Sequence, residues 1–430
     1  MTPRRQLAAC AAMHVVNDAL FTGVYPLLPL LAVDLGLSYA QVGLVKTAFS
    51  GSSSLFQVPA GIVAERVSEH ALLAVGTGWV GAGLLATALA TGFWSLLVIT
   101  LLAGLGGNVQ HPVASSVVSR LFDGGRRGAA IGTLNFAGDI GKVLAPLLVG
   151  GATLVGGWRA GFAVLGAFGA AFAVLYAVVV VPAVAPNSGF RTFQMAWQRK
   201  RALPGLGHEP QTEAPPAPPT EASPAGAAED SAGPGRAAPR SRGWGISRPA
   251  PFAALTAIGM LDAAARGAAL TFLPFLLQAK GLTPAASSAA FAFLFGAGAA
   301  GKALCGPLSD RYGNVAAIVV TELITAGALI GALITPGAWV LAALLPLGFV
   351  LNGTSSVLYA AVAGLVDIDK RARGYGLYYT CSLMASALAP LVYGLLADRA
   401  GLAVTFAAMA AVTAMIVPLT LVVGRALPRS

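Results

Sequence analysis

Twelve long apolar runs divide this 430-residue sequence, six on each side of a polar, proline-rich segment. An apolar run of about 20 residues crosses a bilayer as a helix, because lipid offers the backbone no hydrogen-bond partners. The sequence therefore predicts an all-α polytopic membrane protein with twelve transmembrane helices. The runs cover residues 8–33, 40–63, 71–90, 95–121, 128–156 and 162–181, and then 251–277, 284–309, 315–335, 339–368, 374–397 and 402–423.

Composition excludes the main alternatives to a membrane protein. Only 10% of the residues are charged and the mean hydropathy is +0.75, whereas about 25% of an ordinary soluble domain is charged. A soluble fold could not cover its surface with so few charges, and a disordered chain would be far less apolar.

The polar segment, residues 182–250, holds 12 of the 27 prolines. Such a composition predicts a disordered linker. The linker separates an N-terminal six-helix bundle at 1–181 from a C-terminal six-helix bundle at 251–430.

The distribution of Lys and Arg predicts the side of the membrane on which the linker lies. With twelve spans, the linker and both termini share one side, which carries 20 of the 27 basic residues. Cytoplasmic loops are enriched in Lys and Arg, so linker and termini are expected in the cytoplasm, beside a bacterial-type inner membrane. The formal net charge of +10 then reflects topology, and nucleic acid is not expected as a partner.

The two groups of six runs repeat each other at an offset of 244 to 245 residues. Pro29-Leu30-Leu31 matches Pro274-Phe275-Leu276, and Gly61–Arg66 matches Gly306–Arg311. Two pseudo-symmetric six-helix bundles in parallel duplication are typical of transporters whose halves rock about a substrate site near the midplane.

One of these repeated motifs resembles the signature of the major facilitator superfamily, and it reads Gly306-Pro307-Leu308-Ser309-Asp310-Arg311-Tyr312-Gly313. Its counterpart is a weaker match, with Glu65 in place of Asp. The resemblance implies the major facilitator fold and a cytoplasmic latch between neighbouring helices. The latch residues would be Gly61, Glu65, Arg66, Gly306, Asp310 and Arg311.

Two further motifs are similar to the fosmidomycin-resistance branch of drug exporters. They are His14-Val15-Val16-Asn17-Asp18 with Tyr25-Pro26-Leu27-Leu28, and Gly104-Leu105-Gly106-Gly107-Asn108-Val109-Gln110-His111-Pro112. The resemblance implies efflux of a small, drug-like organic molecule by proton antiport. Lys46, Asp139 and Lys142 are departures from what that branch leads one to expect.

Ionisable residues inside the predicted spans are the candidates for proton coupling. His14 and Asp18 lie four residues apart and share one face of a helix, so the His could relay a proton to the carboxylate. Asp262 aligns with Asn17 in the repeat and is the third candidate. The plainer interpretation of His14 and Asp18 is a hydrogen bond between packed helices without proton traffic.

Other polar residues in the spans are candidates for holding the substrate. Lys46 has no obvious partner within one turn, so it either holds an anionic group or extends towards the outer surface. His111 either faces the substrate or satisfies the carbonyl freed by Pro112. The acid–base pairs either open during transport or only neutralise each other, whereas Lys302 and Glu322 are expected near the latch. The predicted substrate residues are Asn17, Lys46, Asn108, His111, Asp139, Lys142, Arg266 and Asn352.

Motifs for metal binding and catalysis are missing from the sequence. The three cysteines, Cys10, Cys305 and Cys381, are far apart, and no Gly-x-x-x-x-Gly-Lys-Ser/Thr, Gly-x-Ser-x-Gly or His-Glu-x-x-His occurs. We therefore expect no enzyme activity, no cofactor and no metal site.

The sequence thus predicts a monomeric secondary transporter whose partners are a small molecule, protons and the bilayer. Its predicted activity is proton-coupled efflux of a small organic molecule by rocking of the two bundles. The predicted substrates include organic anions. An importer of a metabolite or metal chelate is the first alternative. A membrane scaffold or receptor that acts through the linker is the second.

Overall fold

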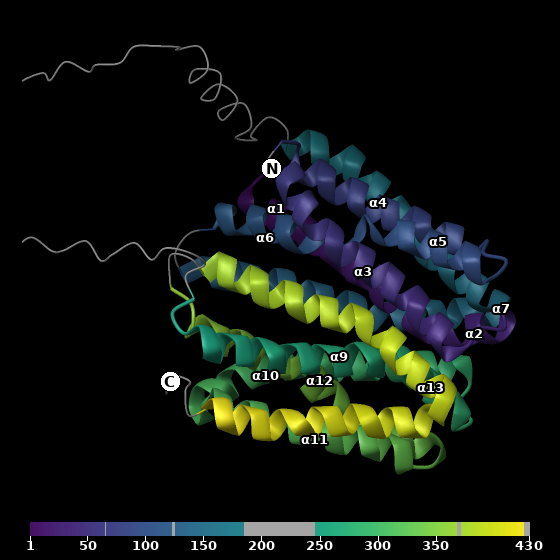
Figure 1. Cartoon of the computed structure of the whole chain (residues 1–430). Coiled ribbons are helices and arrows are strands. Elements are labelled where there is room, and N and C mark those ends of the chain that lie inside the picture. The colour runs from purple at the N-terminus through teal and green to yellow at the C-terminus, as the bar shows by residue number, and fades with distance from the viewer. Residues whose placement is uncertain (65, 123–124, 185–245, 368–370, 425–430) are drawn as a thin grey trace, which may run out of the picture. The chain divides into compact units, whose positions relative to one another are not determined.

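The computed structural model describes residues 1–64, 66–122, 125–184, 246–367 and 371–424, and helices dominate these ranges (Figure 1). The N-terminal helices are α1 (Pro3–Thr22), η1 (Tyr25–Leu27), α2 (Leu28–Asp34), α3 (Tyr39–Ala64), α4 (Glu69–Thr87), α5 (Phe93–Gly104), η2 (Gly107–Val109), α6 (Gln110–Leu121) and α7 (Gly125–Val184). The C-terminal helices are α9 (Pro249–Ala279), α10 (Pro284–Tyr312), α11 (Asn314–Ile334), η4 (Gly337–Trp339), α12 (Val340–Ala363) and α13 (Arg371–Gly424).

Eight of the described helical segments are long and apolar enough to cross a membrane. Two of these, of 59 and 49 residues, are long enough to cross twice, and they turn at non-helical glycines, Gly156–Gly157 in α7 and Gly401 in α13. The α3 helix and the run from α5 to α6 complete the pattern of twelve. The prediction of an all-α polytopic membrane protein is therefore confirmed.

The predicted linker lies mostly outside the described residues, which leave out 185–245. At its edges, Pro182 to Val184 still belong to α7, and Pro249 already begins α9.

Helices α1, α4 and α10 begin where the sequence offers capping residues. The side chains of Thr2, Ser68 and Thr283 accept hydrogen bonds from the first turns of these helices. Proline follows Thr2 and Thr283. At this first position of a helix, the missing N–H of proline removes no hydrogen bond within the helix.

Two runs that the sequence predicts as continuous are broken in the structure. The first helix ends at Thr22 and resumes as α2 after η1, and the fourth ends at Gly104 and resumes at Gln110. A Cβ on Gly104 would lie 2.2 Å from the carbonyl oxygen of Phe49, so this position needs glycine to let α5 approach α3. The second break places His111 in the first turn of α6.

Small residues also bring α1 and α7 into close contact. A Cβ on Gly141 would lie 2.0 Å from the carbonyl oxygen of Val15, and a Cβ on Gly138 would lie 2.6 Å from the Asp18 carboxylate. Because both positions are glycine, the α7 backbone can pack directly against the face of α1 that carries Asp18.

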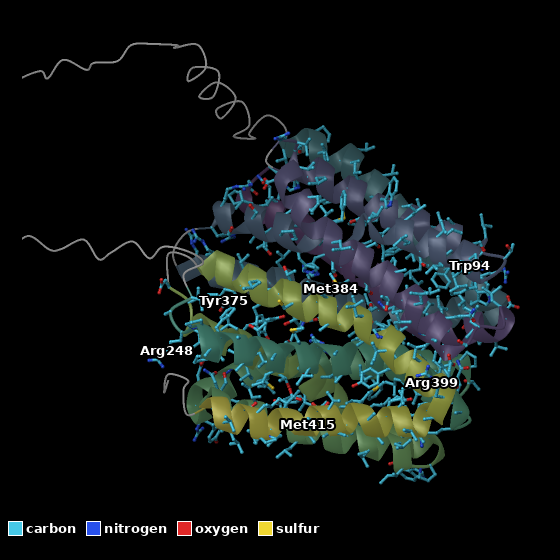
Figure 2. The ribbon with its side chains drawn as sticks, viewed as in Figure 1. Trp94, Arg248, Tyr375, Met384, Arg399 and Met415 are labelled. Carbon is cyan, nitrogen blue, oxygen red and sulfur yellow. The ribbon has the colours of Figure 1, made fainter. Side chains whose placement is uncertain are left out.

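We call the end of the bundle where α1 begins and α13 ends the proximal end, and the opposite end the distal end. Figure 2 shows Arg248 and Tyr375 at the proximal end, and Trp94 and Arg399 at the distal end. Aromatic and basic side chains at both ends of apolar helices are typical of proteins anchored at membrane–water interfaces.

Helices α3 and α13 join the N-terminal and C-terminal helices at the distal end (Figure 1). A Cβ on Gly43 would lie 2.1 Å from the carbonyl oxygen of Pro390, and one on Gly394 would lie 2.5 Å from that of Tyr39. The Asp398 carboxylate accepts hydrogen bonds from the N–H groups of Tyr39 (2.7 Å) and Ala40 (2.9 Å), in the first turn of α3. The distal end is therefore held closed by backbone packing and by a carboxylate at a helix N-terminus.

Replacing Asp398 with Asn is expected to weaken this closure, because the neutral amide no longer complements the N-terminus of α3. A carboxylate at such a position contributes about 0.3–2 kcal/mol, so the closed state should lose about 2- to 30-fold in population. Spin labels on the exposed distal residues Val33 and Ile334, in a chain without its three cysteines, would report longer distances. The neighbouring Arg399→Gln is the control, and an unchanged distance in Asp398→Asn would contradict the prediction.

Candidate functional site

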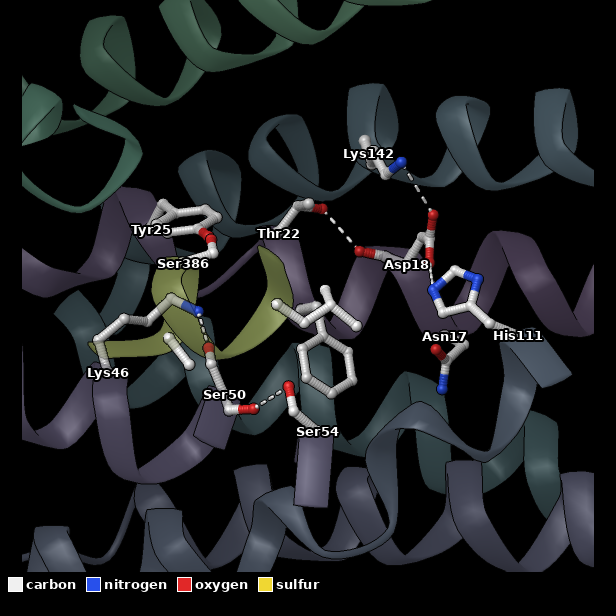
Figure 3. A pocket seen from close by; sticks show the side chains of 13 residues that line it. Asn17, Asp18, Thr22, Tyr25, Lys46, Ser50, Ser54, His111, Lys142 and Ser386 are labelled. Carbon is white, nitrogen blue, oxygen red and sulfur yellow. Dashed lines mark hydrogen bonds and ion pairs between the residues drawn. The ribbon is translucent and has the colours of Figure 1, made fainter. Parts of the chain in front are cut away.

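A cavity of about 210 Å³ lies between the N-terminal helices and α13 (Figure 3). Figure 3 shows Lys46 at one end of this cavity, and Asp18 and His111 at the other. Ser386 of α13 joins the wall, so both groups of helices contribute to it. The lining residues are Asn17, Asp18, Phe21, Thr22, Tyr25, Lys46, Ser50, Ser54, His111, Lys142, Leu383, Ser386 and Ala387.

Lys46 places a buried ammonium group at the first end of the cavity. Its Nζ atom donates to Ser50 Oγ at 2.6 Å and lies 4.7 Å from the centre of the Tyr25 ring. Within the part of the chain that the structure describes, no carboxylate pairs with this amine, although its residue is only 5% exposed. Hydroxyl and aromatic groups therefore solvate the cation without neutralising it.

Asp18 is the centre of a cluster of ionisable groups at the other end. Its Oδ1 atom lies 3.5 Å from Nε2 of His14 and 3.8 Å from Nε2 of His111, and its Oδ2 atom lies 3.1 Å from Nζ of Lys142. The two imidazole rings meet edge to face, with their centres 4.9 Å apart. Three helices, α1, α6 and α7, thus bring together residues that lie far apart in the sequence.

Lys142 continues this cluster towards the C-terminal helices. Its Nζ atom also lies 2.9 Å from Oδ1 of Asp139, and the same oxygen accepts a hydrogen bond of 2.7 Å from Lys302 of α10. The result is a chain of alternating charges, Asp18, Lys142, Asp139 and Lys302, that runs from α1 through α7 to α10.

The ligand atoms of His14, Asp18 and His111 lie within 4.8 Å of one another, a spacing that a metal ion could use. The charges argue against such an ion. The two acids, Asp18 and Asp139, already balance the two lysines, so a divalent cation would add two buried charges without compensation.

A second cluster lies in the C-terminal helices. Asp262 and Arg266 on α9 are 4.0 Å apart, and Glu322 of α11 is fully buried beside them. None of these three residues lines the cavity that contains Lys46.

Several predicted substrate residues do not line the cavity. Asp139 is buried in the charge chain, and Arg266 pairs with Asp262. Asn352 packs against Gly298, because a Cβ added to Gly298 would lie 2.3 Å from the Asn352 side-chain nitrogen. The Asn108 side chain lies outside the described residues, as does Glu65 of the predicted latch.

The remaining latch residues lie towards the proximal ends of α3 and α10. Arg66, Asp310 and Arg311 are exposed, and the Arg311 guanidinium lies 5.4 Å from the centre of the neighbouring Tyr312 ring. These contacts give no test of a latch between helices, so that role remains a prediction.

Several residues of the cavity and of the two clusters are not indicated by the sequence. Tyr25 belongs to a motif without an assigned role, no motif includes Ser50 or Ser386, and the positions of Lys302 and Glu322 predict a place near the latch. Ser50 lies one helical turn from Lys46, so its position could have identified it. Ser386, Lys302 and Glu322 reach their neighbours across helix–helix contacts, which spacing along one helix does not reveal.

Comparison with known proteins agrees with this architecture. A family model of the Major Facilitator Superfamily matches residues 10–354 and 255–429. The fosmidomycin resistance protein of Escherichia coli (strain K12) is 33% identical over 142 residues, which cover 33% of this chain and 35% of that protein. The hexuronate transporter of Bacillus subtilis (strain 168) is 29% identical over 148 residues, 34% of this chain and 35% of the other. The chain thus aligns with about a third of the length of each relative.

Solved structures share the fold over nearly the whole chain. A bacterial homologue of the human lysosomal transporter Spinster superposes with a TM-score of 0.75 at 17% identity, covering 99% of this chain and 97% of that one. The nucleoside transporter NupG superposes with a TM-score of 0.70 at 13% identity, covering 97% and 99%.

These matches define the class of the protein. It is a multi-pass membrane protein with the fold of transporters rather than enzymes. The chain belongs to the major facilitator superfamily. The resemblance to this family and to its fosmidomycin-resistance branch, first indicated by short motifs, is confirmed.

Proposed function

We propose that this chain is a secondary transporter of a small organic anion, and that a proton on Asp18 promotes binding of the anion. The observation that carries the proposal is Lys46, a buried ammonium without a carboxylate partner in the described chain, at one end of a cavity that Lys142 also lines. An unpaired buried charge is costly, and an anionic substrate group would compensate it.

The names of several relatives support an anionic substrate. Besides the hexuronate transporter, they include a probable L-galactonate transporter of Escherichia coli (strain K12) and a probable sulfoacetate transporter of Cupriavidus necator. Hexuronate, galactonate and sulfoacetate are all small organic anions.

The contacts of Lys142 support one sign for the proposed coupling, which is joint binding of proton and anion. When Asp18 is ionised, its carboxylate competes with a substrate anion for the Lys142 ammonium at 3.1 Å. A proton on Asp18, relayed by His14 or His111, removes this competitor and leaves Lys142 free to face the cavity. Proton and anion then bind together.

The charge chain offers a way to link binding to movement of the two groups of helices. Asp139 holds both Lys142 and Lys302 through the same oxygen. An anion in the cavity would attract Lys142 away from Asp139. Asp139 would then pair with Lys302 alone, and this would strengthen the link between α7 and α10. Alternating access would then follow from rocking of one helix group against the other.

The direction of transport separates two candidate functions. Likeness to the fosmidomycin resistance protein favours efflux, which a proton gradient can drive only if proton and substrate compete for the site. Joint binding of proton and anion instead favours import by symport, the first alternative that the sequence offers. We give the second candidate more weight, because it rests on the contacts of Lys142.

Transport into proteoliposomes tests the proposal. With purified full-length protein and radiolabelled sulfoacetate, hexuronate or fosmidomycin, we expect uptake when the exterior is acidic, and loss of that uptake with a protonophore. Uptake driven by an acidic interior would overturn joint binding and favour antiport. If no pH gradient affects the flux of any probe, proton coupling is wrong.

The proposal also includes the orientation of the chain in the membrane and its oligomeric state. We infer that the proximal end, with the termini, faces the cytoplasm of a bacterial-type inner membrane, and that the protein acts as a monomer. The excess of Lys and Arg on this side, 20 of 27, supports the orientation.

A further inference from the structure

The cluster in the C-terminal helices holds more acid than base. Asp262 and Arg266 lie one turn apart on α9, with their closest charged atoms 4.0 Å apart. Glu322 of α11 is fully buried, and its charged neighbours are the same two residues. The described groups that also face Asp262 or Arg266 are the phenols of Tyr25, Tyr359 and Tyr378, which add no cation to the cluster.

Full ionisation would leave this cluster with a net charge of −1 in a buried environment. Two carboxylates would share one guanidinium, and the remaining negative charge would have no second cation among the described groups to stabilise it. Burying such a charge without a partner costs several kcal/mol, and two neighbouring carboxylates oppose joint ionisation. One bound proton makes the cluster neutral.

Hydrogen bonding points to the same occupancy. Neither carboxyl oxygen of Glu322 has a donor among the described groups, although the Asp262 carboxyl group lies next to it. Two ionised carboxylates offer only acceptor atoms, so they cannot bond to each other. A proton on either one turns this contact into a hydrogen bond and satisfies a buried group that is otherwise unpaired.

We propose that Asp262 and Glu322 form a second proton-binding site, which holds one proton between them while Arg266 neutralises the other carboxylate. The proton belongs to the pair rather than to one residue. The site lies on α9 and α11, whereas Asp18 lies on α1, so each group of helices carries an ionisable site of its own. The occupancy of this pair does not depend on whether the chain transports anions.

Infrared difference spectra between wild type and each variant, recorded on the full-length protein at neutral pH, test the proposal directly. They report the carbonyl stretch of protonated carboxylic acids. Glu322→Gln and Asp262→Asn should each remove the band of one protonated carboxyl group, because the acid that remains ionises beside Arg266. The double variant should also remove only one such band. Glu69→Gln, at an acid that contacts Arg120 outside the cluster, is the control and should leave the band unchanged.

The charge count predicts the opposite change in the infrared spectrum when the cation is removed. Arg266→Met should add the band of one further protonated carboxyl group, since no cation then stabilises the second carboxylate. Thermal unfolding and size-exclusion elution identify variants that fail to fold, and Glu322→Gln alone decides the question if Arg266→Met is one of them. An unchanged band in Glu322→Gln, or loss of two bands in the double variant, would overturn the proposal.

Discussion

Lys46→Met is expected to weaken binding of an organic anion by about 10- to 100-fold. The substitution keeps a long apolar side chain beside Tyr25 and Phe49 but removes the ammonium group. A hydrogen bond to a charged group contributes about 1.5–3 kcal/mol, and each 1.4 kcal/mol corresponds to a factor of ten in affinity. Titration calorimetry with sulfoacetate or hexuronate measures the loss.

Two control variants separate the charge of Lys46 from its packing. Lys46→Arg keeps the cation and should retain a larger part of the affinity than Lys46→Met. Arg126→Gln removes an exposed cation from the first turn of α7 and should leave binding unchanged. Binding to Lys46→Met that equals wild type would show that the anion lies elsewhere.

Gly43→Ala is expected to open the distal end of the bundle. The added Cβ would lie 2.1 Å from the carbonyl oxygen of Pro390 and 2.6 Å from its carbon, and these backbone atoms cannot yield as a flexible side chain would. Overpacking of this kind costs about 1–3 kcal/mol. The closed arrangement of α3 and α13 should therefore lose about 5- to 150-fold in population relative to a state in which they separate.

The α3 helix provides a matched control for this prediction. Gly51 lies two turns further along the same helix, and a Cβ there would meet no atom within 4 Å. Distances between spin labels on Val33 and Ile334 should lengthen in Gly43→Ala and stay as in wild type in Gly51→Ala. Equal distances in both variants would contradict a gating role for this contact.

The fold could be predicted well because its determinants repeat along the sequence. Apolar runs indicate the spans, and local spacing indicates which residues of one helix are neighbours. The pairs Asp139–Lys142 and Asp262–Arg266, three and four residues apart, indeed lie at 2.9 Å and 4.0 Å.

Contacts between helices could not be predicted in the same way. The position of Lys302 along α10 suggests the latch, but the rotation of α10 against α7 places its amine on Asp139. Glu322 similarly reaches Asp262 from a different helix, α11, so spacing along α9 does not reveal the contact. The break before α6 coincides with the close approach of Gly104 to α3, which involves a second helix.

The pH dependence of anion binding to wild type and to Asp18→Asn tests the central claim most directly. Across the pH range in which Asp18 loses its proton, wild-type affinity should fall as pH rises, because the ionised Asp18 takes Lys142 away from the anion. Asp18→Asn should bind more tightly than wild type at the alkaline end, by about 5- to 10-fold, with a flatter profile. Wild-type affinity that rises with pH, or an unchanged profile in Asp18→Asn, would contradict the joint binding of proton and anion.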